Sequence, residues 1–221
     1  MPDAAAMIAE IEAEARLTAH WTGREQFSPR VLAALRRVRR EAFVLPGAAA
    51  AAYLNAPLKI GHGQTISQPF IVALMSDLLD LAPDDRVLEV GTGSGYQAAV
   101  LAELVPNVFS VEVIPELAAR AARTLAEQGY GRIALRCGDG GLGWPEHAPF
   151  DAIIVTAAAR AVPPALVAQL APGGRLVIPV GEPGDGQELR LLRKEADGAV
   201  TSRGVLAVAF VPLTGGSAEA V

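Results

Sequence analysis

The spacing of apolar residues changes near residue 86 and divides the chain into two parts. Before that point, apolar residues recur three and four positions apart, which is typical of helices with one buried side. This spacing predicts helices at residues 3–20, 28–38 and 69–81. We expect a short helix or an ordered loop at residues 47–53, and a loop or short hairpin at residues 55–68, which are rich in glycine and polar groups.

From residue 86 onward, short apolar runs alternate with helical stretches. The predicted strands cover residues 86–90, 107–112, 132–137, 150–155 and 174–179, and the predicted helices cover residues 95–104, 115–128 and 163–170. Strands separated by helices form βαβ units, and nearly continuous apolar runs such as VLEV and AIIV are typical of strands covered on both faces. Residues 188–195 and 204–211, with a turn at Asp197-Gly198, are expected to add antiparallel strands at one edge.

The sequence therefore predicts an α/β fold: a doubly wound, mostly parallel, Rossmann-like sheet. We expect residues 1–60 to form an N-terminal helical extension, residues 61–214 the main domain, and residues 215–221 a loose tail. A chain of 221 residues is long enough to bury a sizeable core, so these parts are expected to form one compact domain.

Two predictions concern the N-terminal part. The first helix should bury the side formed by Met7, Ile8, Ile11, Ala15 and Leu17. Four arginines near the end of the second helix are interpreted as its solvated, positively charged end, which the helix dipole favours. They are Arg36, Arg37, Arg39 and Arg40.

A glycine-rich loop follows the first predicted strand of the main domain, in the segment RVLEVGTGSGY at residues 86–96. Gly91, Gly93 and Gly95 allow the backbone to approach a ligand where a Cβ would collide with it. The dinucleotide fingerprint GxGxxG needs a glycine where this chain has Tyr96. The pattern is therefore GxGxG, preceded by Glu89.

A second acidic residue indicates which ligand the loop holds. Glu112 ends the next predicted strand about twenty residues after the first glycine, where a carboxylate can accept hydrogen bonds from both hydroxyls of a ribose. Residues 87–119 contain no Lys or Arg. An acidic loop of this kind favours a cationic cofactor, and S-adenosylmethionine, with its sulfonium and ammonium groups, is the best candidate.

Composition excludes several classes of function. The net charge of −5 argues against a nucleic-acid-binding face. A single cysteine, Cys137, excludes an internal disulfide and a cysteine-based zinc site, and we expect no metal. The first residues are acidic, unlike a signal peptide, and no uninterrupted apolar run has the length of a membrane span. We therefore expect a cytoplasmic enzyme.

Several motifs together make the chain similar to a known family. They are REAFV (40–44), GHGQTISQPF (61–70), VLEVGTGSGYQ (87–97), GDGGLGWPEHAPFDAIIVTAA (138–158), LAPGGRLVIPVG (170–181) and FVPL (210–213). The chain resembles the protein-L-isoaspartate(D-aspartate) O-methyltransferases, which repair damaged aspartyl and asparaginyl sites, from about residue 27 to residue 213. The glycine loop alone is shared by many methyltransferases, whereas GQTIS is far more specific.

The resemblance implies roles for individual residues. The residues implied in binding S-adenosylmethionine are Glu89, Gly91, Thr92, Gly93, Ser94 and Gly95 for the methionine part, Glu112 and Val113 around the ribose, and Asp139 and Gly140 at the adenine. The serine of QTIS is the family's active-site residue, which here is Ser67, with Thr65 beside it. Ile66, Thr156, Ala157 and Ala158 would line the isoaspartyl slot.

The implied acceptor is the free α-carboxylate of an L-isoaspartyl residue, or the side-chain carboxylate of a D-aspartyl residue, in a peptide or unfolded segment. Such a carboxylate titrates near pH 3–4, so it is ionised at neutral pH and needs no strong base. The protein has to align it with the methyl group, and neutral hydroxyls do this without forming an ion pair. The resemblance implies S-adenosylhomocysteine as one product and an ester that cyclises to a succinimide as the other. We expect a monomer.

Alternatives remain open at this point. The chain could be a methyltransferase for a small molecule or one dedicated peptide, a nicotinamide-dependent oxidoreductase, or a cofactor-binding protein without catalysis. Thr65 or Ser67 could simply cap the following helix. We interpret His62 as a surface residue and Trp144 as a packing residue. Arg160 lies where the family commonly has a proline-bearing loop, and we expect it to face water.

Overall fold

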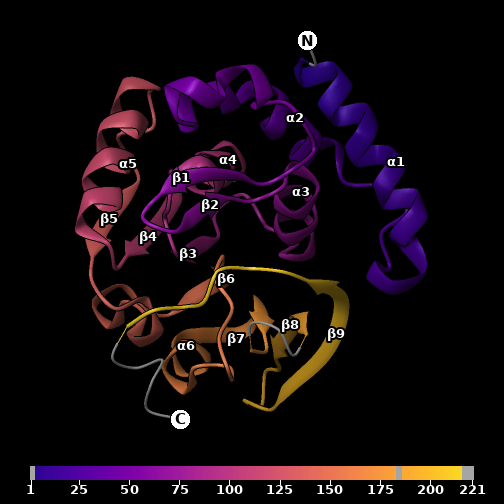
Figure 1. Cartoon of the computed structure of the whole chain (residues 1–221). Helices are drawn as coiled ribbons and strands as arrows, with labels where there is room; N and C mark the ends of the chain where they lie inside the picture. The colour runs from indigo at the N-terminus through magenta and orange to yellow at the C-terminus, as the bar shows by residue number, and fades with distance from the viewer. Residues whose placement is uncertain (1–2, 183–185, 216–221) are drawn as a thin grey trace.

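The computed structural model describes residues 3–182 and 186–215 and has a mixed β-sheet at its centre (Figure 1). The described part of this sheet has seven strands in the order β5-β4-β3-β6-β7-β8-β9. They are β3 (Arg86–Val90), β4 (Asn107–Glu112), β5 (Ala134–Cys137), β6 (Phe150–Val155), β7 (Leu170–Val180), β8 (Gln187–Lys194) and β9 (Val200–Val208). The first five are mutually parallel, and β8 and β9 add antiparallel pairs at one edge.

The chain order places a switch point beside β3. From β3 the chain moves outward through β4 to β5, and then returns to β6 on the other side of β3. In sheets of this kind ligands bind beyond the carboxyl ends of the strands at the switch point. The predicted glycine loop lies at this position because it directly follows β3.

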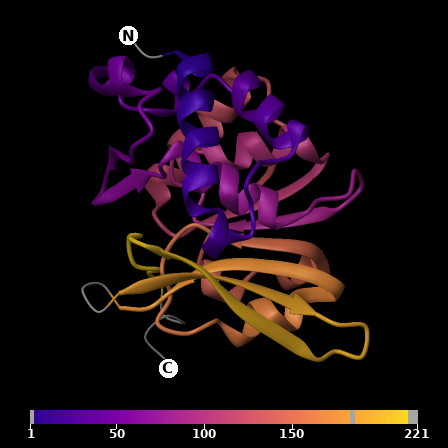
Figure 2. The ribbon, with the colours of Figure 1, turned by 90° about the vertical axis from the view of Figure 1, so that its right-hand side faces the viewer.

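Helices cover the two faces of the sheet unequally. The helices are α1 (Ala4–Thr22), α2 (Pro29–Arg37), α3 (Pro69–Leu78), α4 (Tyr96–Leu104), α5 (Pro115–Glu127) and α6 (Pro164–Gln169). Alternate residues of β3 belong to two cores: Val87 packs in the core that contains α1 to α5, and Leu88 in the core that contains α6. Figure 2 shows α1 on one side of the sheet and α6 on the other. The prediction of a doubly covered, mostly parallel sheet is confirmed.

Local signals account for the ends of the first helices. The Asp3 side chain accepts a hydrogen bond from the backbone N–H of Ala6 at 2.9 Å and so caps α1. Gly23, with φ +70°, ends α1 in the left-handed region that glycine tolerates. Ser28 caps α2 by accepting from the N–H of Val31, and Pro29 follows it at the first helical position.

The segment before β3 forms a small hairpin. Four short 3₁₀ helices complete the set of described elements. The hairpin consists of β1 (Leu58–Gly61) and β2 (Gln64–Ile66), so the hairpin alternative for residues 55–68 is correct. The 3₁₀ helices are η1 (Arg40–Phe43), η2 (Pro46–Ala51), η3 (Gly140–Leu142) and η4 (Pro145–His147). Residues before and after the predicted boundary at residue 60, such as Met7 and Val87, pack in the same hydrophobic core.

Several predicted boundaries and one predicted burial were inaccurate. Helix α3 ends at Leu78 rather than residue 81, β5 begins at Ala134 rather than residue 132, and β7 begins at Leu170, four residues before the predicted start. The edge strand predicted at residues 204–211 is β9, which covers Val200–Val208. Leu17 is 75% exposed, whereas the other four residues predicted for the buried side of α1 are buried. Of the predicted tail, residues 216–221 lie outside the described residues.

The interpretation of the arginine cluster was wrong for Arg40. Arg36, Arg37 and Arg39 are exposed, but Arg40 is fully buried. The chain leaves the helical conformation after Arg37, and η1 turns the Arg40 side chain inward. Sequence periodicity could not reveal this, because the turn between α2 and η1 changes which side of the backbone faces the core.

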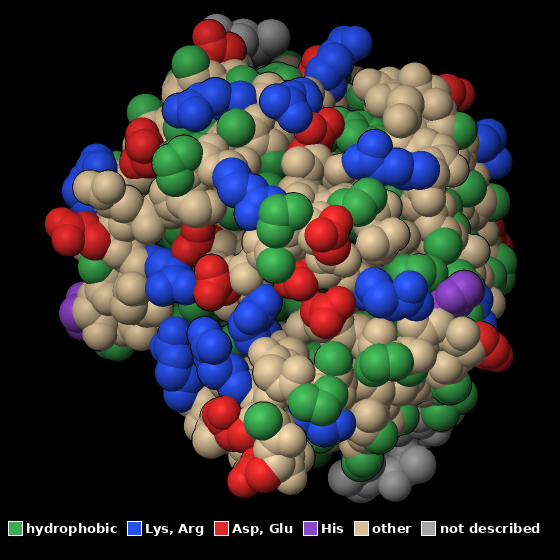
Figure 3. All heavy atoms as spheres, turned by 180° about the vertical axis from the view of Figure 1, so that it is seen from behind, with side chains coloured by type: hydrophobic (Ala, Val, Ile, Leu, Met, Phe, Trp, Pro, Cys, Tyr) green, Lys and Arg blue, Asp and Glu red, His purple; other side chains and the backbone are tan. Residues whose placement is uncertain are grey.

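The face of the molecule seen in Figure 3 carries charged side chains of both signs. Most of its Lys and Arg side chains lie near Asp or Glu side chains, and several at the lower left lie next to one another. Within residues 3–182 and 186–215, none of the helices has the length and apolar character needed to cross a membrane.

Candidate functional site

The glycine loop joins β3 to α4 and packs tightly against the end of β6. Gly91 has φ +96°, and a Cβ there would lie 2.6 Å from the Oγ1 atom of Thr156. The Thr156 hydroxyl donates to the carbonyl oxygen of Gly91 at 2.7 Å, and the N–H of Gly91 donates to the carbonyl of Val111 at 2.8 Å. Glycine is required at residue 91 for both its backbone conformation and this close contact.

Glu112 lies at the end of β4 and is held by the backbone. One carboxylate oxygen accepts from the N–H of Gly93 at 2.7 Å, and the other accepts from the N–H of Ile114 at 3.0 Å. An ionised carboxylate has about four acceptor positions, so it can still accept hydrogen bonds from a ligand. The side chain is nearly buried but borders a pocket. This arrangement suits a group with two neighbouring hydroxyls, such as a ribose.

Glu89 lies behind the glycine loop rather than in the pocket wall. Its side chain is fully buried, and its Oε2 atom accepts from the Ser110 hydroxyl at 2.5 Å. The Ser110 hydroxyl is also 2.5 Å from Oγ1 of Thr92. Burial raises the pKa of Glu89 to about 8; the Ser110 hydroxyl lowers it, and the nearby Glu112 raises it further. The chain from Glu89 through Ser110 to Thr92 supports the loop from beneath.

The pKa of Glu89 leads to a stability prediction. The unfolded chain releases this proton near the ordinary value of 4.5, and the folded protein releases it near pH 8. Between these values the folded state holds a proton that the unfolded state lacks, so folding stability falls with rising pH, by about 1.4 kcal/mol per unit. The contribution is fully present below pH 4.5 and is lost by about pH 8. Glu89→Gln, which stays neutral, should remove this loss.

The measurement is thermal unfolding of the cofactor-free protein at several pH values from 5 to 8. The unfolding temperature of Glu89→Gln should rise relative to wild type as the pH increases. Glu116→Gln, at an exposed position, serves as the control and should follow wild type. If the unfolding temperatures of wild type and Glu89→Gln changed with pH in parallel, Glu89 would not titrate as inferred.

The carboxyl ends of β3, β4 and β6 border a hollow that we call the inner pocket. Its wall combines apolar side chains, the glycine loop and the Glu112 carboxylate. The lining residues are Gln64, Thr65, Val90, Gly91, Gly93, Val111, Glu112, Val113, Ile114, Gly140, Thr156, Ala157 and residues 211–214. A Cβ on Gly140 would lie 2.4 Å from Cγ1 of Val90, so glycine keeps this wall close to the strand.

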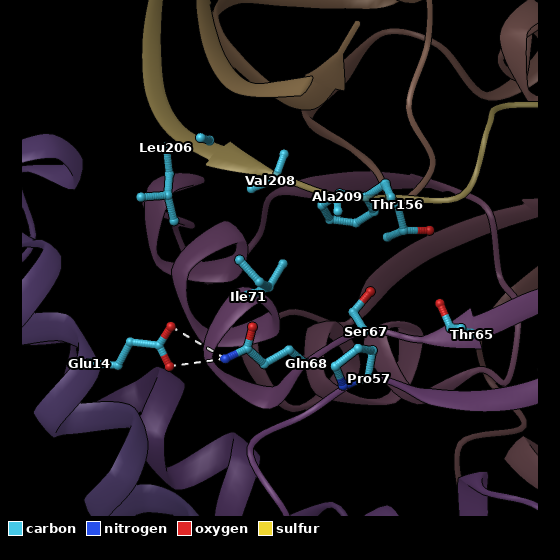
Figure 4. Close-up of a pocket in the computed structure, with 12 residues that line it drawn as sticks. Glu14, Pro57, Thr65, Ser67, Gln68, Ile71, Thr156, Leu206, Val208 and Ala209 are labelled. Atoms are coloured by element: carbon cyan, nitrogen blue, oxygen red, sulfur yellow. Dashed lines mark hydrogen bonds between the residues drawn. The ribbon is translucent and has the colours of Figure 1, made fainter. Parts of the chain in front are cut away.

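A second hollow, which we call the outer groove, adjoins the inner pocket. It has a volume of about 480 Å³ and lies between α1, the β1–β2 hairpin and the end of β9. Its lining residues are Glu14, Pro57, Thr65, Ser67, Gln68, Ile71, Thr156 and residues 206–210. Thr65 and Thr156 line both spaces, so the two meet at this pair. Figure 4 shows the hydroxyls of Thr65 and Ser67 directed into the space in front of Thr156.

Ser67 is not the cap of the following helix. The residue at the cap position of α3 is Gln68, whose own side chain makes no capping hydrogen bond. In the first turn of α3, the N–H of Phe70 donates to the side-chain oxygen of Asn55 at 3.0 Å. The amide of Gln68 instead donates to the carboxylate of Glu14 on α1 (Figure 4). Glu14 also accepts from the side chain of Asn55 at 2.7 Å. These contacts tie the segment that carries Thr65 and Ser67 to α1.

Arg40 holds the backbone of Ser67 from the buried side. Its Nη2 atom donates to the Ser67 carbonyl at 2.8 Å, and its Nε atom donates to the Ala52 carbonyl at 2.8 Å. The guanidinium carbon lies 4.7 Å from the centre of the Tyr96 ring. Tyr96 begins α4, directly after the glycine loop. Arg40 therefore connects the Ser67 segment to the helix that follows the loop.

The segment after β9 crosses the sheet and covers the inner pocket. Figure 1 shows this segment in yellow, running from β9 back past the end of β6. The N–H of Ala158 donates to the carbonyl of Val211 at 2.8 Å, and the N–H of Leu213 donates to the carbonyl of Ala158 at 2.7 Å. This pairing positions residues 211–214 in the pocket wall. The sequence offered only the FVPL motif as a signal, and it did not predict a contact with the pocket.

The predicted site residues divide into two layers. Those that line the inner pocket or outer groove are Thr65, Ser67, Gly91, Gly93, Glu112, Val113, Gly140, Thr156 and Ala157. The others support the wall from behind or beside it: Ile66, Glu89, Thr92, Ser94, Gly95, Asp139 and Ala158. Lining residues that the prediction missed include Glu14, Gln64, Gln68 and Ile71. They come from elements whose relative placement the sequence does not show.

The structure also locates the residues whose roles were left open. His62 is exposed in the hairpin turn with φ +53°. The Trp144 ring packs edge to face against Phe109, so its interpretation as a packing residue is confirmed. Arg160 is largely exposed and forms an ion pair with Glu182 at 2.7 Å. Among the described residues, no group of three His, Cys, Asp or Glu side chains is placed to hold a metal ion.

The lining of the inner pocket, which encloses about 50 Å³ in this structure, has the chemistry that S-adenosylmethionine needs. The Glu112 carboxylate can accept from ribose hydroxyls, and Gly91, Gly93 and Gly140 keep the backbone close where side chains would fill the space. Val111, Val113 and Ile114 provide apolar surface for a planar base. The loop residues 91–95 contain no charged side chain that would repel a cation.

Comparison with known proteins identifies the family. The family model for protein-L-isoaspartate(D-aspartate) O-methyltransferase matches residues 17–218. The chain is 54% identical over 212 residues to protein-L-isoaspartate O-methyltransferase 2 of Syntrophobacter fumaroxidans, covering 96% of this chain and 86% of that relative. It is 53% identical over 209 residues to protein-L-isoaspartate O-methyltransferase 2 of a Polaromonas species, covering 95% and 99%.

A solved structure agrees with the sequence relatives. It is named protein-L-isoaspartate O-methyltransferase and superposes with a TM-score of 0.79 at 28% identity, covering 94% of this chain and 66% of that one. The fold, the sequence motifs and the two adjoining hollows thus all indicate the same family. The chain belongs to the protein-L-isoaspartate(D-aspartate) O-methyltransferase family.

Proposed function

We propose that this protein transfers the methyl group of S-adenosylmethionine to the free α-carboxylate of L-isoaspartyl residues, and to the side-chain carboxylate of D-aspartyl residues, in damaged proteins. The observation that carries the proposal is the meeting of the inner pocket and the outer groove at Thr65 and Thr156. A methyl donor in one space and a carboxylate in the other would approach each other there. The resulting ester would cyclise to a succinimide, whose hydrolysis returns part of the chain to normal aspartate.

We assign the inner pocket to the cofactor. When bound, S-adenosylmethionine supplies an electrophilic methyl group on a positively charged sulfur. Glu112 holds the ribose, with its orientation set in advance by the N–H groups of Gly93 and Ile114. The residues proposed for the adenine remain Asp139 and Gly140, and those proposed to contact the methionine part are Gly91 and Gly93, which line the pocket. In this assignment Glu89, Thr92 and Ser94 act by supporting the loop.

We assign the outer groove to the acceptor. Its hydroxyl groups donate hydrogen bonds to one oxygen of the carboxylate and leave the other free to attack the methyl carbon. The carboxylate is already ionised at neutral pH, so catalysis consists of alignment and partial removal of water rather than proton abstraction. The apolar wall formed by Ile71 and residues 206–210 restricts water around the acceptor.

The experiment that tests the function is a comparison of two peptides with the same sequence, one with L-isoaspartate and one with L-aspartate at a single position. Methyl transfer from labelled S-adenosylmethionine should occur only with the isoaspartyl peptide. Equal methylation of both peptides, or of neither, would contradict the proposal. It would then favour the alternative, a carboxyl methyltransferase for a small molecule or one dedicated peptide.

Ser67→Ala should reduce kcat about 10- to 100-fold with little change in cofactor affinity. The estimate corresponds to one lost hydrogen bond to a charged group. Ser67 lines the outer groove but not the inner pocket, so its removal should leave cofactor binding intact. Kinetics with the isoaspartyl peptide and calorimetry with S-adenosylhomocysteine measure the two effects separately. Ser202→Ala, at an exposed position on β9, is the matched control.

A different pattern would reassign Ser67. If Ser67→Ala lost cofactor affinity as severely as turnover, its role would be to maintain the architecture of the site. If turnover were unchanged, Thr65 alone would carry the positioning.

We further propose that the enzyme acts in the cytoplasm as a monomer. The chain has a single cysteine, which suits a reducing compartment. Size-exclusion chromatography with light scattering tests the oligomeric state directly.

A further inference from the structure

A third hollow continues the outer groove along β9, and we call it the distal cleft. It has a volume of about 520 Å³ and lies between the end of α1 and β9. Its lining residues are His20, Trp21, Glu188 and residues 204–207. Leu206 and Ala207 line both the outer groove and the distal cleft. The two hollows therefore adjoin at these two residues.

One stretch of backbone runs past all three spaces in order. Residues 211–214 line the inner pocket, residues 206–210 the outer groove, and residues 204–207 the distal cleft. The segment from Gly204 to Phe210 would be roughly 20 Å long as extended chain, which is about the length of six residues of a bound peptide. A peptide with its isoaspartyl residue at Thr65 and Thr156 can thus reach the distal cleft with one flank.

β9 is the last strand in the described part of the sheet, so its outer edge has no strand partner among the described residues. Its pairing with β8 shifts register near Leu189 and Arg190, opposite Gly204 and Leu206. Such bulges are frequent at sheet edges and redirect side chains. Gly204 and Leu206 at the bulge line the distal cleft, and Figure 2 shows the end of α1 above β9.

The α1 wall of the cleft is aromatic and exposed. Trp21 is 60% exposed, and the centre of its ring lies 3.6 Å from that of His20. Large aromatic side chains that remain exposed beside a groove are frequent binding determinants, because they bury much apolar area at a low cost in side-chain entropy. Leu17 is also exposed on α1, but it does not line the cleft.

We propose that Trp21 and His20 form a subsite for an apolar or aromatic side chain that flanks the isoaspartyl residue by about three to five positions. This inference rests on the proposed function, because the occupant is the flank of the acceptor peptide. The continuity of the distal cleft with the outer groove favours this occupant over a second copy of the chain. The subsite makes the enzyme prefer damaged sites with an exposed hydrophobic neighbour, as unfolded segments have.

The test uses L-isoaspartyl peptides that carry leucine, tryptophan or alanine three, four or five positions from the isoaspartyl residue. One series places this residue on the N-terminal side and another on the C-terminal side. For wild type, leucine or tryptophan should lower KM about tenfold relative to alanine in one of the two series, as expected for burying one apolar side chain. In Trp21→Ala this preference should disappear, while kcat and the KM of the alanine peptides stay unchanged.

Two control variants separate the subsite from general effects. Trp21→Phe should retain most of the preference, and Leu17→Ala should behave as wild type. An unchanged KM ratio in Trp21→Ala would overturn the inference, as would a change in oligomeric state on that substitution, which would identify a second copy as the occupant. Absence of methylation of every isoaspartyl peptide by wild type would instead contradict the proposed function.

Discussion

Glu112→Ala should weaken the binding of S-adenosylmethionine and S-adenosylhomocysteine by at least about 100-fold. In the proposed assignment two ribose hydroxyls donate to this buried carboxylate, and the substitution removes both hydrogen bonds, each worth about 1.5–3 kcal/mol. It also leaves the N–H groups of Gly93 and Ile114 without their acceptor. Because Gly93 belongs to the glycine loop, the loop conformation that faces the cofactor is disturbed as well.

Calorimetric titration with S-adenosylhomocysteine measures this loss without requiring turnover. Saturating cofactor should restore most of kcat, because Glu112 does not line the outer groove. Glu116→Ala removes a carboxylate four residues later on an exposed face of α5 and should bind as wild type. Wild-type affinity in Glu112→Ala would contradict the assignment of the ribose to this residue.

Arg40→Met should lower both stability and turnover. The substitution leaves the carbonyl oxygens of Ala52 and Ser67 without their donor, and each buried unsatisfied group costs about 1–3 kcal/mol. The contact with the Tyr96 ring is lost as well. We expect the free energy of unfolding to fall by about 2–5 kcal/mol, which lowers the unfolding temperature by roughly 5–15 °C.

The effect of Arg40→Met on turnover distinguishes a positioning role from a purely structural one. Release of the Ser67 carbonyl should misplace the Ser67 hydroxyl, so kcat should fall at least about tenfold at temperatures where the variant is fully folded. The affinity for S-adenosylhomocysteine should change less than kcat. Arg40→Lys keeps the charge but cannot reach both carbonyls with a planar fork, so it should recover only part of the loss.

The exposed Arg36→Met provides the matched control, with stability and kcat expected to equal those of wild type. An Arg40→Met protein that is destabilised but retains full kcat when folded would limit Arg40 to a structural role. Wild-type stability would contradict the inferred cost of the two unsatisfied carbonyls.

Local signals in the sequence were sufficient to predict the central part of the fold. Strands at residues 86–90, 107–112 and 150–155 were predicted with the bounds that the structure shows, because each is a short, mainly apolar run between helical or turn-forming stretches. The glycine loop and Glu112 were identified for the same reason: their positions follow from where a strand ends. Strand β7 was less accurate, since Pro172 and Gly173 interrupt the pattern at its start.

The sequence by itself therefore determined the sheet, the loop after β3 and the acidic residue after β4, since these depend on neighbours along the chain. Only the tertiary structure decided that Arg40 is buried under Ser67, that residues 211–214 cover the inner pocket, and that Trp21 faces β9. Each of these contacts joins residues that are far apart in the sequence, or depends on an irregular segment that changes the direction of a side chain. Apolar periodicity reports which side of an element is buried, but it does not report which distant element packs against that side.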